Sequence, residues 1–409
     1  MSLIVQKYGG TSVGTVDRIR EVAARIKRTR DAGHSVIAVV SAMSGETDRL
    51  LTLGRGLSEK PVERELDALV ASGEQVSASL LAIALGELGV SARSMLGYQA
   101  RIVTDAAHTK ARIQSIDGEL LRRLAQDQVL VIAGFQGSDG DGNITTLGRG
   151  GSDTSAVAIA AATKADVCEI YTDVDGVYTT DPNTVPSARK IDRITYEEML
   201  ELASLGAKVL QIRSVGLAMK YGIPIHVRSS FSDTEGTIVT REEALLESVV
   251  VAGVAADKKA VKITMRHLRD EPGVVAKVFG ALAEANVVVD MIIQNVSVEG
   301  HTDLTFTVSE EDERHAVEIA RKVGEEIGVK EVLANADVVK VSIVGVGMRN
   351  HAGIAAKMFR LLADEGINIE AISTSEIKTS CLIHAKYTEL ALRVLHDGFG
   401  LANAPGEGA

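Results

Sequence analysis

Two hydrophobic patterns alternate along the first two-thirds of the chain. Short continuous apolar runs are typical of buried strands, and between them apolar residues recur at helical spacing. The predicted strands are Ser2–Lys7, Ser35–Val40, Ala100–Val103, Gln128–Ala133, Val167–Tyr171 and Ile223–Val227, and the predicted helices include Val16–Arg30, Leu66–Leu88 and Ala156–Lys164. This alternation predicts an α/β fold in which a mainly parallel sheet is covered by helices on both faces, giving three layers.

The last third of the chain repeats itself with an offset of 80 residues. Asp270–Phe279 matches Asn350–Phe359, and Asn286–Asp290 matches Gly366–Glu370. Two copies are too few for a solenoid, so we expect two small modules. The first copy predicts the order strand, helix, strand, strand, helix, strand, at Val261–Met265, Gly273–Ala285, Val287–Ile293, Thr302–Val308, Glu310–Ile327 and Glu331–Asn335.

The second copy, Val339 to about Phe399, lacks a closing strand, because its tail, Gly400–Ala409, is too polar and glycine-rich. Ser248–Val254 is an unassigned apolar strand upstream of both copies, and we expect it to supply the missing strand. The predicted boundaries are therefore a first domain at 1–230, a linker at 231–247, and a module at 261–336 inserted into a second one formed by 248–256 and 338–399. Two independent modules that pack together are the alternative.

Charge and composition argue against several classes of protein. The net charge of −11 argues against a nucleic-acid partner, although a local positive pocket for small anions remains compatible with it. The two cysteines, Cys168 and Cys381, lie far apart without a partner motif, which indicates a reducing compartment and a cytoplasmic location. We see no metal-ligand spacing, no signal peptide, and no apolar run near the roughly 18 residues that a membrane span needs.

Glycine-rich breaks follow several predicted strands, at the sheet edge where α/β folds bind ligands. In Leu147–Ala156, glycines 148, 150 and 151 allow positive φ angles and a close backbone approach, and Ser152 or Asp153 can cap the following helix. The helix N-terminus suits an anion, and Arg149 offers a fork for a carboxylate. An ordinary strand–turn–helix corner is the alternative. Neither a P-loop nor a dinucleotide fingerprint occurs.

Two further features suggest a nucleotide. Lys7 ends the first strand beside Gly9 and Gly10, where its charge and the glycine N–H groups suit a phosphate, although a solvated strand-end lysine is the alternative. Thr172–Pro182 is rich in carboxylates and hydroxyls that can hold ribose, base and hydrated Mg²⁺; ordinary turn chemistry is the alternative. Lys208 is a second candidate phosphate lysine.

Five stretches, in order, resemble the signatures of the aspartate kinases within the amino-acid kinase family. They are Lys7–Gly14, Ser41–Asp48, Ser72–Glu74, Leu147–Asp153 and Tyr171–Pro182. The resemblance, which covers nearly the whole chain, implies transfer of the ATP γ-phosphoryl group to the side-chain carboxylate of L-aspartate. The product would be 4-phospho-L-aspartate, at the start of the route to lysine, threonine and methionine.

The same resemblance implies a role for each matching residue. Lys7 would stabilise the transferring phosphoryl group, and Asp153 would orient Lys7 or the substrate. Arg149 would bind the α-carboxylate of aspartate and Glu74 its ammonium group. Further substrate contacts would come from Ser41, Thr47, Gly150, Gly151 and Ser152, and contacts to ATP with Mg²⁺ from Lys7, Tyr8, Gly9, Gly10, Ser41, Thr172, Asp173, Tyr178, Asp181 and Lys208. The metal ligands stay open.

The repeated modules resemble ACT domains, which are ferredoxin-like amino-acid sensors that pair side by side. Family behaviour implies lysine and threonine as feedback effectors and a homo-oligomer formed through these modules; dimerisation alone is the alternative. Asp290 and Glu370 would meet a ligand ammonium group, and Ala352 in place of the usual proline would make the second pocket less rigid. The implied effector residues are Asp270, Val274, Val275, Val288, Val289, Asp290, Gln294, Asn350, Ile354, Ala355, Asn368, Ile369, Glu370 and Thr374.

Two other functions remain compatible with the sequence. The chain could be another amino-acid kinase that acts on a carboxylate or carbamate, or an amino-acid sensor with a degenerate kinase domain. The second is disfavoured because Lys7, Glu74, Arg149 and Asp153 are all present.

Overall fold

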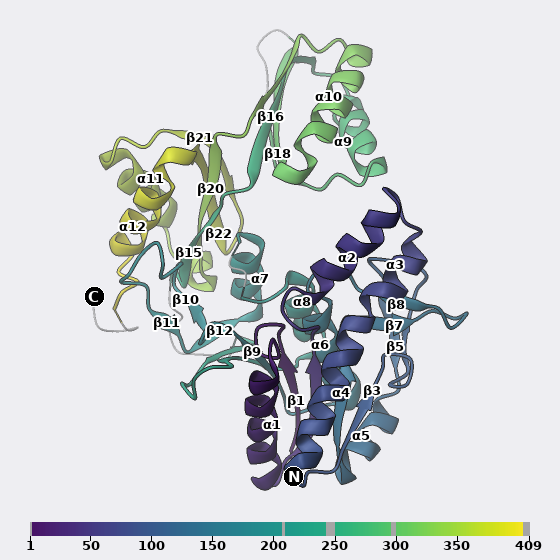
Figure 1. The fold of residues 1–409 in the computed structure, drawn as a ribbon. Helices are drawn as coiled ribbons and strands as arrows, with labels where there is room; N and C mark the ends of the chain where they lie inside the picture. Colours follow the sequence, from purple (N-terminus) through teal and green to yellow (C-terminus); the bar gives the residue numbers. More distant parts are fainter. Residues whose placement is uncertain (1, 207–208, 243–249, 296–299, 404–409) are drawn as a thin grey trace. The chain divides into compact units, whose positions relative to one another are not determined.

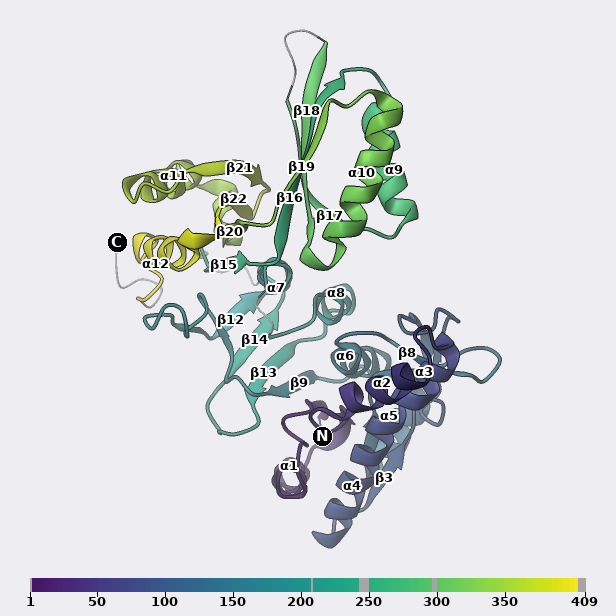
Figure 2. The same ribbon diagram turned by 45° about the horizontal axis from the view of Figure 1, so that its top comes forward.

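The structure, a computed structural model, describes residues 2–206, 209–242, 250–295 and 300–403. The chain divides into two compact units, which we describe separately (Figures 1 and 2). The first unit comprises Met1–Val177, Lys190–Ala203 and Lys208–Leu245, and the second comprises Tyr178–Arg189, Ser204–Ala207 and Leu246–Ala409.

An eight-stranded sheet forms the centre of the first unit, in the order β12-β14-β13-β9-β1-β2-β6-β3. All neighbouring strands are parallel except the antiparallel pair β13 and β14, so the predicted mainly parallel sheet is confirmed. The strands are β1 (Leu3–Tyr8), β2 (Ser35–Val40), β3 (Ala92–Met95), β6 (Val129–Ala133), β9 (Val167–Thr172), β12 (Arg193–Thr195), β13 (Ile225–Ser229) and β14 (Thr237–Thr240).

Helices cover both faces of this sheet, which gives the predicted three layers. In β2, Val36, Ala38 and Val40 belong to the core shared with α1 (Val16–Asp31) and α4 (Ser72–Glu87). Ile37 and Val39 alternate with them and are equally buried, because successive side chains of a strand point to opposite faces. The other face carries α5 (Gly118–Asp127) and α6 (Gly151–Thr163), with α8 (Ile212–Tyr221) packed on α6.

Smaller elements surround this core. A second sheet has the order β5-β4-β7-β8, from Ile113–Ile116, Ile102–Thr104, Gln136–Ser138 and Ile144–Thr146. The predicted strand at 100–103 therefore belongs to this sheet. The remaining elements are α2 (Glu46–Leu57), α3 (Glu63–Val70), α7 (Tyr196–Ser204) and the short strands β10 (Val177–Tyr178) and β11 (Lys190–Ile191).

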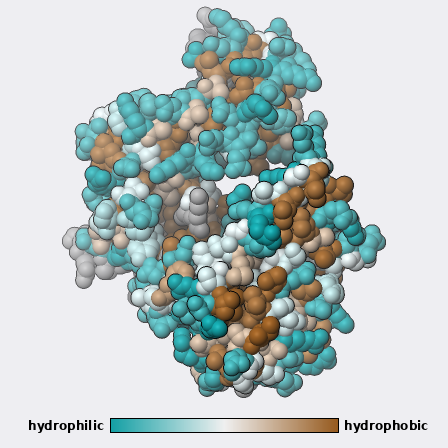
Figure 3. All heavy atoms as spheres, in the orientation of Figure 1, coloured by the Kyte–Doolittle hydropathy of each residue, from teal (hydrophilic) through white to brown (hydrophobic). Residues whose placement is uncertain are grey.

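The predicted single helix 66–88 is two helices, α3 and α4, joined through Ala71. Together they span 25 residues and are, by length and composition alone, apolar enough to cross a membrane. Leu81 and Leu85 of α4 are fully buried in the core of the first unit. Apolar residues that include Val76 and Ile83 are exposed, and Figure 3 shows apolar residues gathered over α4. Packing against the sheet accounts for much of this composition.

Two predicted boundaries are wrong. The segment 231–247 is not a linker throughout, because Thr237–Thr240 forms β14 and pairs with β13 and β12 in the main sheet. Residues 178–189 do not belong to the first domain: Val185 lies in the core of the second unit, and the Val254 N–H donates to the Thr179 carbonyl at 2.7 Å.

The first module of the second unit is a four-stranded antiparallel sheet in the order β17-β18-β16-β19, with two helices packed together on it (Figure 2). Its strands are β16 (Ala260–Arg269), β17 (Val289–Gln294), β18 (His301–Ser309) and β19 (Glu331–Asn335), and its helices are α9 (Val274–Glu284) and α10 (Glu313–Ile327).

The second module has the matching order β15-β20-β22-β21, from Gly253–Asp257, Val338–Val344, Lys378–His384 and Ile369–Thr374, with α11 (Ile354–Asp364) and α12 (Thr388–Gly398). Strand β15 pairs antiparallel with β20, in the place that β19 holds in the first module. The first module thus lies in the chain between β15 and β20, as the count of strands predicted. The strand starts at Gly253, later than expected, and residues 248 and 249 lie outside the described part.

Candidate functional site

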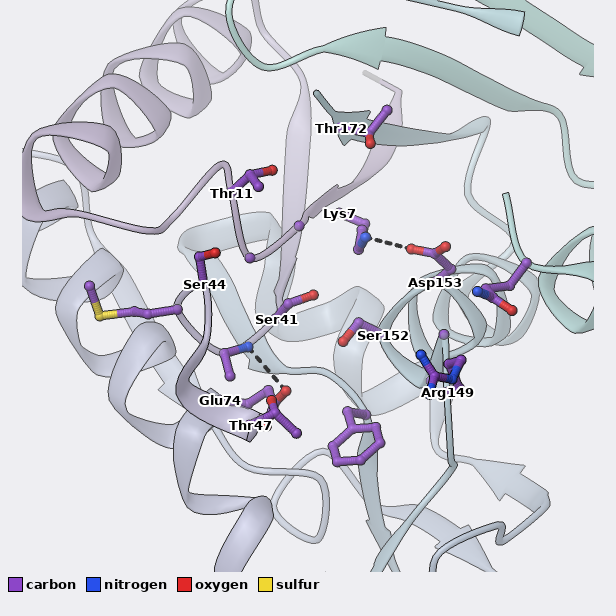
Figure 4. A pocket seen from close by; sticks show the side chains of 18 of the residues that line it. Lys7, Thr11, Ser41, Ser44, Thr47, Glu74, Arg149, Ser152, Asp153 and Thr172 are labelled. Atoms are coloured by element: carbon purple, nitrogen blue, oxygen red, sulfur yellow. Dashed lines mark hydrogen bonds and ion pairs between the residues drawn. The ribbon is translucent and has the colours of Figure 1, made fainter. Parts of the chain in front are cut away.

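A pocket opens where β1, β2 and β9 end in the first unit (Figure 4). Separate loops supply its wall, and all five stretches that carry the resemblance contribute to it. Ser41–Asp48 and Leu147–Asp153 line it over most of their length, Lys7–Gly14 over half, and the other two with only Glu74, Thr172 and Asp173. The lining residues are Lys7, Gly9, Gly10, Thr11, Ser41, Ala42, Met43, Ser44, Gly45, Thr47, Asp48, Glu74, Phe135, Gly148, Arg149, Gly150, Gly151, Ser152, Asp153, Thr172, Asp173 and Gln211.

Lys7 and Asp153 form an ion pair in this pocket. The Lys7 Nζ lies 2.6 Å from an oxygen of Asp153, and each side chain is only 11% exposed. Lys7 comes from the end of β1 and Asp153 from the first turn of α6, so two separate elements fix the ammonium group (Figure 4). The pair places a fixed positive charge beside Gly9, which also lines the pocket.

Helix α6 begins at Gly151, five residues earlier than predicted. Gly150 is its N-cap in the left-handed conformation, with φ of 72°, and no side chain caps the helix. The prediction that Ser152 or Asp153 caps it is therefore wrong: both lie inside the first turn, because the helix starts directly after the glycine. The uncapped first turn presents its N–H groups and its dipole to an anion.

The loop that carries Arg149 has a tightly specified backbone. Gly148 and Gly150 both take positive φ angles, 77° and 72°, as the glycine cluster predicted. A Cβ atom at Gly150 would lie 1.9 Å from Cγ of Gln211, so a larger residue does not fit there without moving Gln211. Arg149 itself is exposed and lines the pocket.

Glu74 is a buried carboxylate in the pocket wall, with 3% of its surface exposed. One oxygen accepts a hydrogen bond from the Ala42 N–H at 3.0 Å, whereas Oε2 has no hydrogen-bond partner among the described residues. Burial raises the pKa of Glu74 to about 7, and the hydrogen bond from Ala42 opposes that rise. A buried carboxylate with a free oxygen suits a ligand cation. Gly73 lets α4 pack closely against Ala42, because a Cβ atom at position 73 would lie 2.8 Å from Cβ of Ala42.

The predicted nucleotide contacts divide into two groups. Thr172 and Asp173, at the end of β9, line the pocket. Tyr8 does not: its side chain is fully buried, donates to Gln6, and stacks on Tyr171 with ring centroids 4.8 Å apart. The Tyr8 side chain points away from the pocket, because successive side chains in a strand point to opposite faces. The predicted contact of Tyr8 with the nucleotide stays a prediction, and only the Tyr8 backbone could make it.

The other three predicted nucleotide residues do not line the pocket. Tyr178 lies in β10 and is assigned to the second unit. The Asp181 carboxylate accepts hydrogen bonds from Asn183 and Thr184, which is the turn chemistry considered as the alternative. Lys208 lies outside the described residues.

Several lining residues were missed. Thr11, Ser44 and Asp48 lie inside the quoted motifs, so the motifs already contained them. Phe135 follows a predicted strand, and its φ of 67° is a conformation that the sequence does not reveal. Gln211 carries no sequence signal and is identified only by its packing against Gly150.

The two predicted effector loops have the same backbone. Gly273 and Gly353 cap α9 and α11 with φ angles of 94° and 90° and no side-chain cap, although Pro272 is replaced by Ala352. The glycine thus suffices to set the turn. Asp270 and Asn350 are exposed before these helices. The other predicted residues lie in the first turns of the helices (Val274, Val275, Ile354, Ala355), in β17 and β21 (Val289, Gln294, Ile369, Thr374), or directly before these strands (Val288, Asn368).

The two acidic effector candidates are ion-paired. Asp290 contacts the Lys340 ammonium and Glu370 the Lys262 ammonium, and in each pair the lysine belongs to the other module. Both carboxylates thus already bind an ammonium group, the chemistry that was predicted for an amino-acid ligand.

Comparison with known proteins agrees with this geometry. The profile of the amino acid kinase family matches residues 2–229, and an ACT domain profile matches 261–323 and 341–399. An aspartokinase of Pseudomonas aeruginosa is 56% identical over 404 residues, which is 98% of each chain. The chain belongs to the amino acid kinase family, within the aspartate kinases.

Solved structures of this family share the whole fold. Aspartokinase III of E. coli in complex with aspartate and ADP is 26% identical, with a TM-score of 0.80 over 97% of this chain and 99% of that one. The same E. coli enzyme in complex with lysine and aspartate gives a TM-score of 0.76 over the same shares.

Proposed function

We propose that this chain, as an aspartate kinase, transfers the γ-phosphoryl group of ATP to the side-chain carboxylate of L-aspartate, giving 4-phospho-L-aspartate and ADP. The observation that carries the proposal is the pocket that brings together the Lys7–Asp153 pair, the free oxygen of Glu74 and the Arg149 loop. The relatives named above, one of them solved with aspartate and ADP, support it.

The reaction needs charge stabilisation rather than a base. The acceptor carboxylate is already ionised at pH 7, so its oxygen attacks the γ-phosphorus while the bond to the bridging oxygen of ADP breaks. Lys7 would neutralise the negative charge that spreads over the transferring group, and Asp153 would hold its ammonium in place. The N–H groups of Gly9, Gly10 and the first turn of α6 would add further donors.

Recognition of the acceptor would use Arg149 and Glu74, which line the same pocket. Arg149 would bind the α-carboxylate, because its guanidinium is a planar two-pronged donor. Glu74 would bind the ammonium group through Oε2, which has no other partner among the described residues. Ser41, Thr47 and Ser152 line the same pocket and would contribute hydroxyl groups.

The nucleotide would lie near Thr172 and Asp173 and bring Mg²⁺ with it. The described residues contain no group of three or more metal-binding side chains. The donors present fit Mg²⁺, which commonly takes its ligands from phosphates, water and one or two carboxylates. Asp173 and Asp48 are the exposed carboxylates in the lining that could supply such a ligand, and the ion would neutralise phosphate charge.

We further propose that lysine, threonine or both inhibit the enzyme through the ACT modules, as an early step of lysine, threonine and methionine synthesis would require. Support comes from the lysine in the E. coli structure and from the two uncapped helix N-termini beside exposed loops. Oligomerisation through the modules is part of this proposal, since exposed apolar residues such as Ile292 and Ile372 lie on their edge strands.

A cytoplasmic location is supported by the two buried, unpaired cysteines.

The test is a coupled assay of ADP release with aspartate, with glutamate and without acceptor. We expect stimulation by aspartate alone, and trapping the acyl phosphate with hydroxylamine should yield the aspartate hydroxamate. Equal stimulation by glutamate would favour another carboxylate kinase, and no stimulation at all would favour a sensor with a degenerate kinase domain. Titration with lysine, threonine and both together tests the regulatory part.

A further inference from the structure

Asp67 is a fully buried carboxylate of α3 that does not line the pocket. Its two oxygens accept hydrogen bonds from the N–H of Thr109, at 3.0 and 3.1 Å, and from the N–H of Thr146, at 3.0 Å. The Thr146 hydroxyl donates at 2.5 Å, and Nδ1 of His108 lies 3.0 Å away. One side chain therefore joins a helix, the loop before β5 and the end of β8.

These contacts hold the strand that leads into the Arg149 loop, which is the loop proposed to bind the substrate. Thr146 is the last residue of β8, and Arg149 follows three residues later. Thr109 packs against the same loop, because a Cβ atom at Gly148 would lie 3.0 Å from the Thr109 carbonyl oxygen. Asp67 thus holds both the strand from which this loop emerges and the segment on which it rests.

Asp67 is also rigidly connected to Glu74. The two residues are seven positions apart, about two helical turns, in α3 and α4, which only Ala71 separates. Ala71 has helical backbone angles, φ of −62° and ψ of −18°, so the helical path is nearly continuous. A second link supports this junction, since the Gln136 side chain donates to the Ala71 carbonyl at 2.9 Å.

The position needs a carboxylate rather than an amide. Both oxygens face donors, and a buried charge that accepts several N–H and O–H bonds is well satisfied. An asparagine would place N–H₂ against backbone N–H groups that cannot accept a hydrogen bond, and the unsatisfied donors would push the segments apart.

From these contacts we propose that Asp67 is a positioning residue that fixes the distance between Glu74 and the Arg149 loop. The enzyme would thereby keep its proposed ammonium-binding and α-carboxylate-binding groups in fixed places in the wall of one pocket (Figure 4). The inference rests on the proposed function, in which those two groups bind aspartate. Asp67 does not touch the substrate.

The test compares Asp67→Asn with the matched variant Glu198→Gln. Glu198 is also a buried carboxylate of the first unit, and it accepts hydrogen bonds from Thr195 far along the chain from the substrate loop. We expect Asp67→Asn to raise KM for aspartate about tenfold or more, with KM for ATP changed less than about twofold. Glu198→Gln should leave both KM values unchanged at a comparable loss of thermal stability.

A second pair of variants tests the positioning role of Asp67 if Asp67→Asn does not fold. Thr146→Val removes one hydroxyl donor at nearly constant volume, and Thr146→Ser keeps it. We expect Thr146→Val to raise KM for aspartate and Thr146→Ser to restore it. Unchanged KM for aspartate in Asp67→Asn and Thr146→Val, or equal increases in both KM values, would overturn the inference. A wild-type enzyme that ignores aspartate would overturn the proposed function instead.

Discussion

At the scale of single residues, the pocket contains two charged side chains that are almost fully buried. The Lys7 ammonium and the Asp153 carboxylate are 2.6 Å apart and almost buried, so removing either leaves the other unpaired. Breaking such a pair generally costs about 3–5 kcal/mol. In the proposed function, the positive charge of this pair would stabilise the transferring phosphoryl group.

Lys7→Ala should lower kcat about a hundredfold or more, while KM for aspartate changes by less than about threefold. The reason is that the ammonium would act on charge that develops during transfer, and aspartate would be held by other groups. Steady-state kinetics measures both constants. Lys27→Ala, which removes a half-exposed lysine of α1 that does not line the pocket, is the control and should leave them unchanged. Equal losses in kcat and in affinity for aspartate would contradict this role.

Glu74 predicts a pH dependence of substrate binding. Only its carboxylate form binds an ammonium group, and burial raises its pKa from 4.5 to about 7. Between pH 8 and pH 6 the ionised fraction falls about tenfold, so KM for aspartate should rise by a similar factor. Glu74→Gln should raise KM at every pH and remove this dependence. A flat profile in the wild-type enzyme would show that Glu74 does not bind the ammonium group.

The same group affects folding in the free enzyme. Its folded pKa lies above its unfolded value, so the folded state binds more protons between about pH 4.5 and pH 7, and stability falls as pH rises through this range. Above pH 7 the penalty is on the order of 3 kcal/mol. Chemical denaturation at pH 8 should therefore find Glu74→Gln at least as stable as the wild-type protein, and a large loss of stability would contradict the burial argument.

At the scale of elements, the start of α6 decides the geometry of the site. The helix begins directly after a left-handed glycine, which leaves its first turn uncapped and turns Asp153 toward Lys7. Any anion bound there would receive the helix dipole and the N–H groups together. The element therefore supplies the charge partner of Lys7 and a helix N-terminus that suits an anion.

Gly150→Ala should raise KM for aspartate about fivefold or more and lower the free energy of unfolding by about 1–3 kcal/mol. The new methyl group would need a strained φ and would displace Gln211 from the pocket wall. Gly142→Ala is the matched control, because its φ of 83° is similar but its Cβ would meet nothing within 4 Å. That variant should lose about 1 kcal/mol without a change in KM. Adding Gln211→Ala to Gly150→Ala should recover part of the lost stability.

At the scale of the whole molecule, the second unit contains two related modules joined by reciprocal ion pairs. Asp290 and Glu370 occupy equivalent positions of the repeat, and each pairs with a lysine of the other module. An effector with its own ammonium group would compete with Lys340 or Lys262 for these carboxylates. Effector binding and the contact between the modules would then be linked, which is a physical route by which a small amino acid changes their packing.

Asp290→Ala should weaken inhibition by lysine about tenfold or more while uninhibited turnover stays within about twofold of wild type. The proposed effector site would lose a carboxylate, while the proposed catalytic pocket lies in the other unit. Inhibition curves at fixed substrate concentrations measure both. Glu331→Ala, which removes an exposed carboxylate of β19, should leave inhibition unchanged. Loss of uninhibited turnover would place Asp290 in the fold or in catalysis.

The sequence by itself determined the parallel sheet, the repeat and the inserted module, and it located most of the pocket in the glycine-rich breaks. These features depend on local quantities: the spacing of apolar residues, the backbone freedom of Gly148 and Gly150, and the chain direction that places strand ends at one edge. Lys7 and Arg149 were predicted in this way and Asp153 from the family resemblance, and the pocket contains all three.

Only the tertiary structure decided which groups are buried and what they meet. Tyr8 packs in the core, the turn at Asp181 lies outside the pocket, β14 joins the main sheet, and Val185 joins the second unit. Asp67 gives no local signal, since its partners are 41 to 79 positions away in the chain. Burial and hydrogen bonding between such distant residues set the pKa of Glu74 and the position of the Arg149 loop, and no local pattern encodes them.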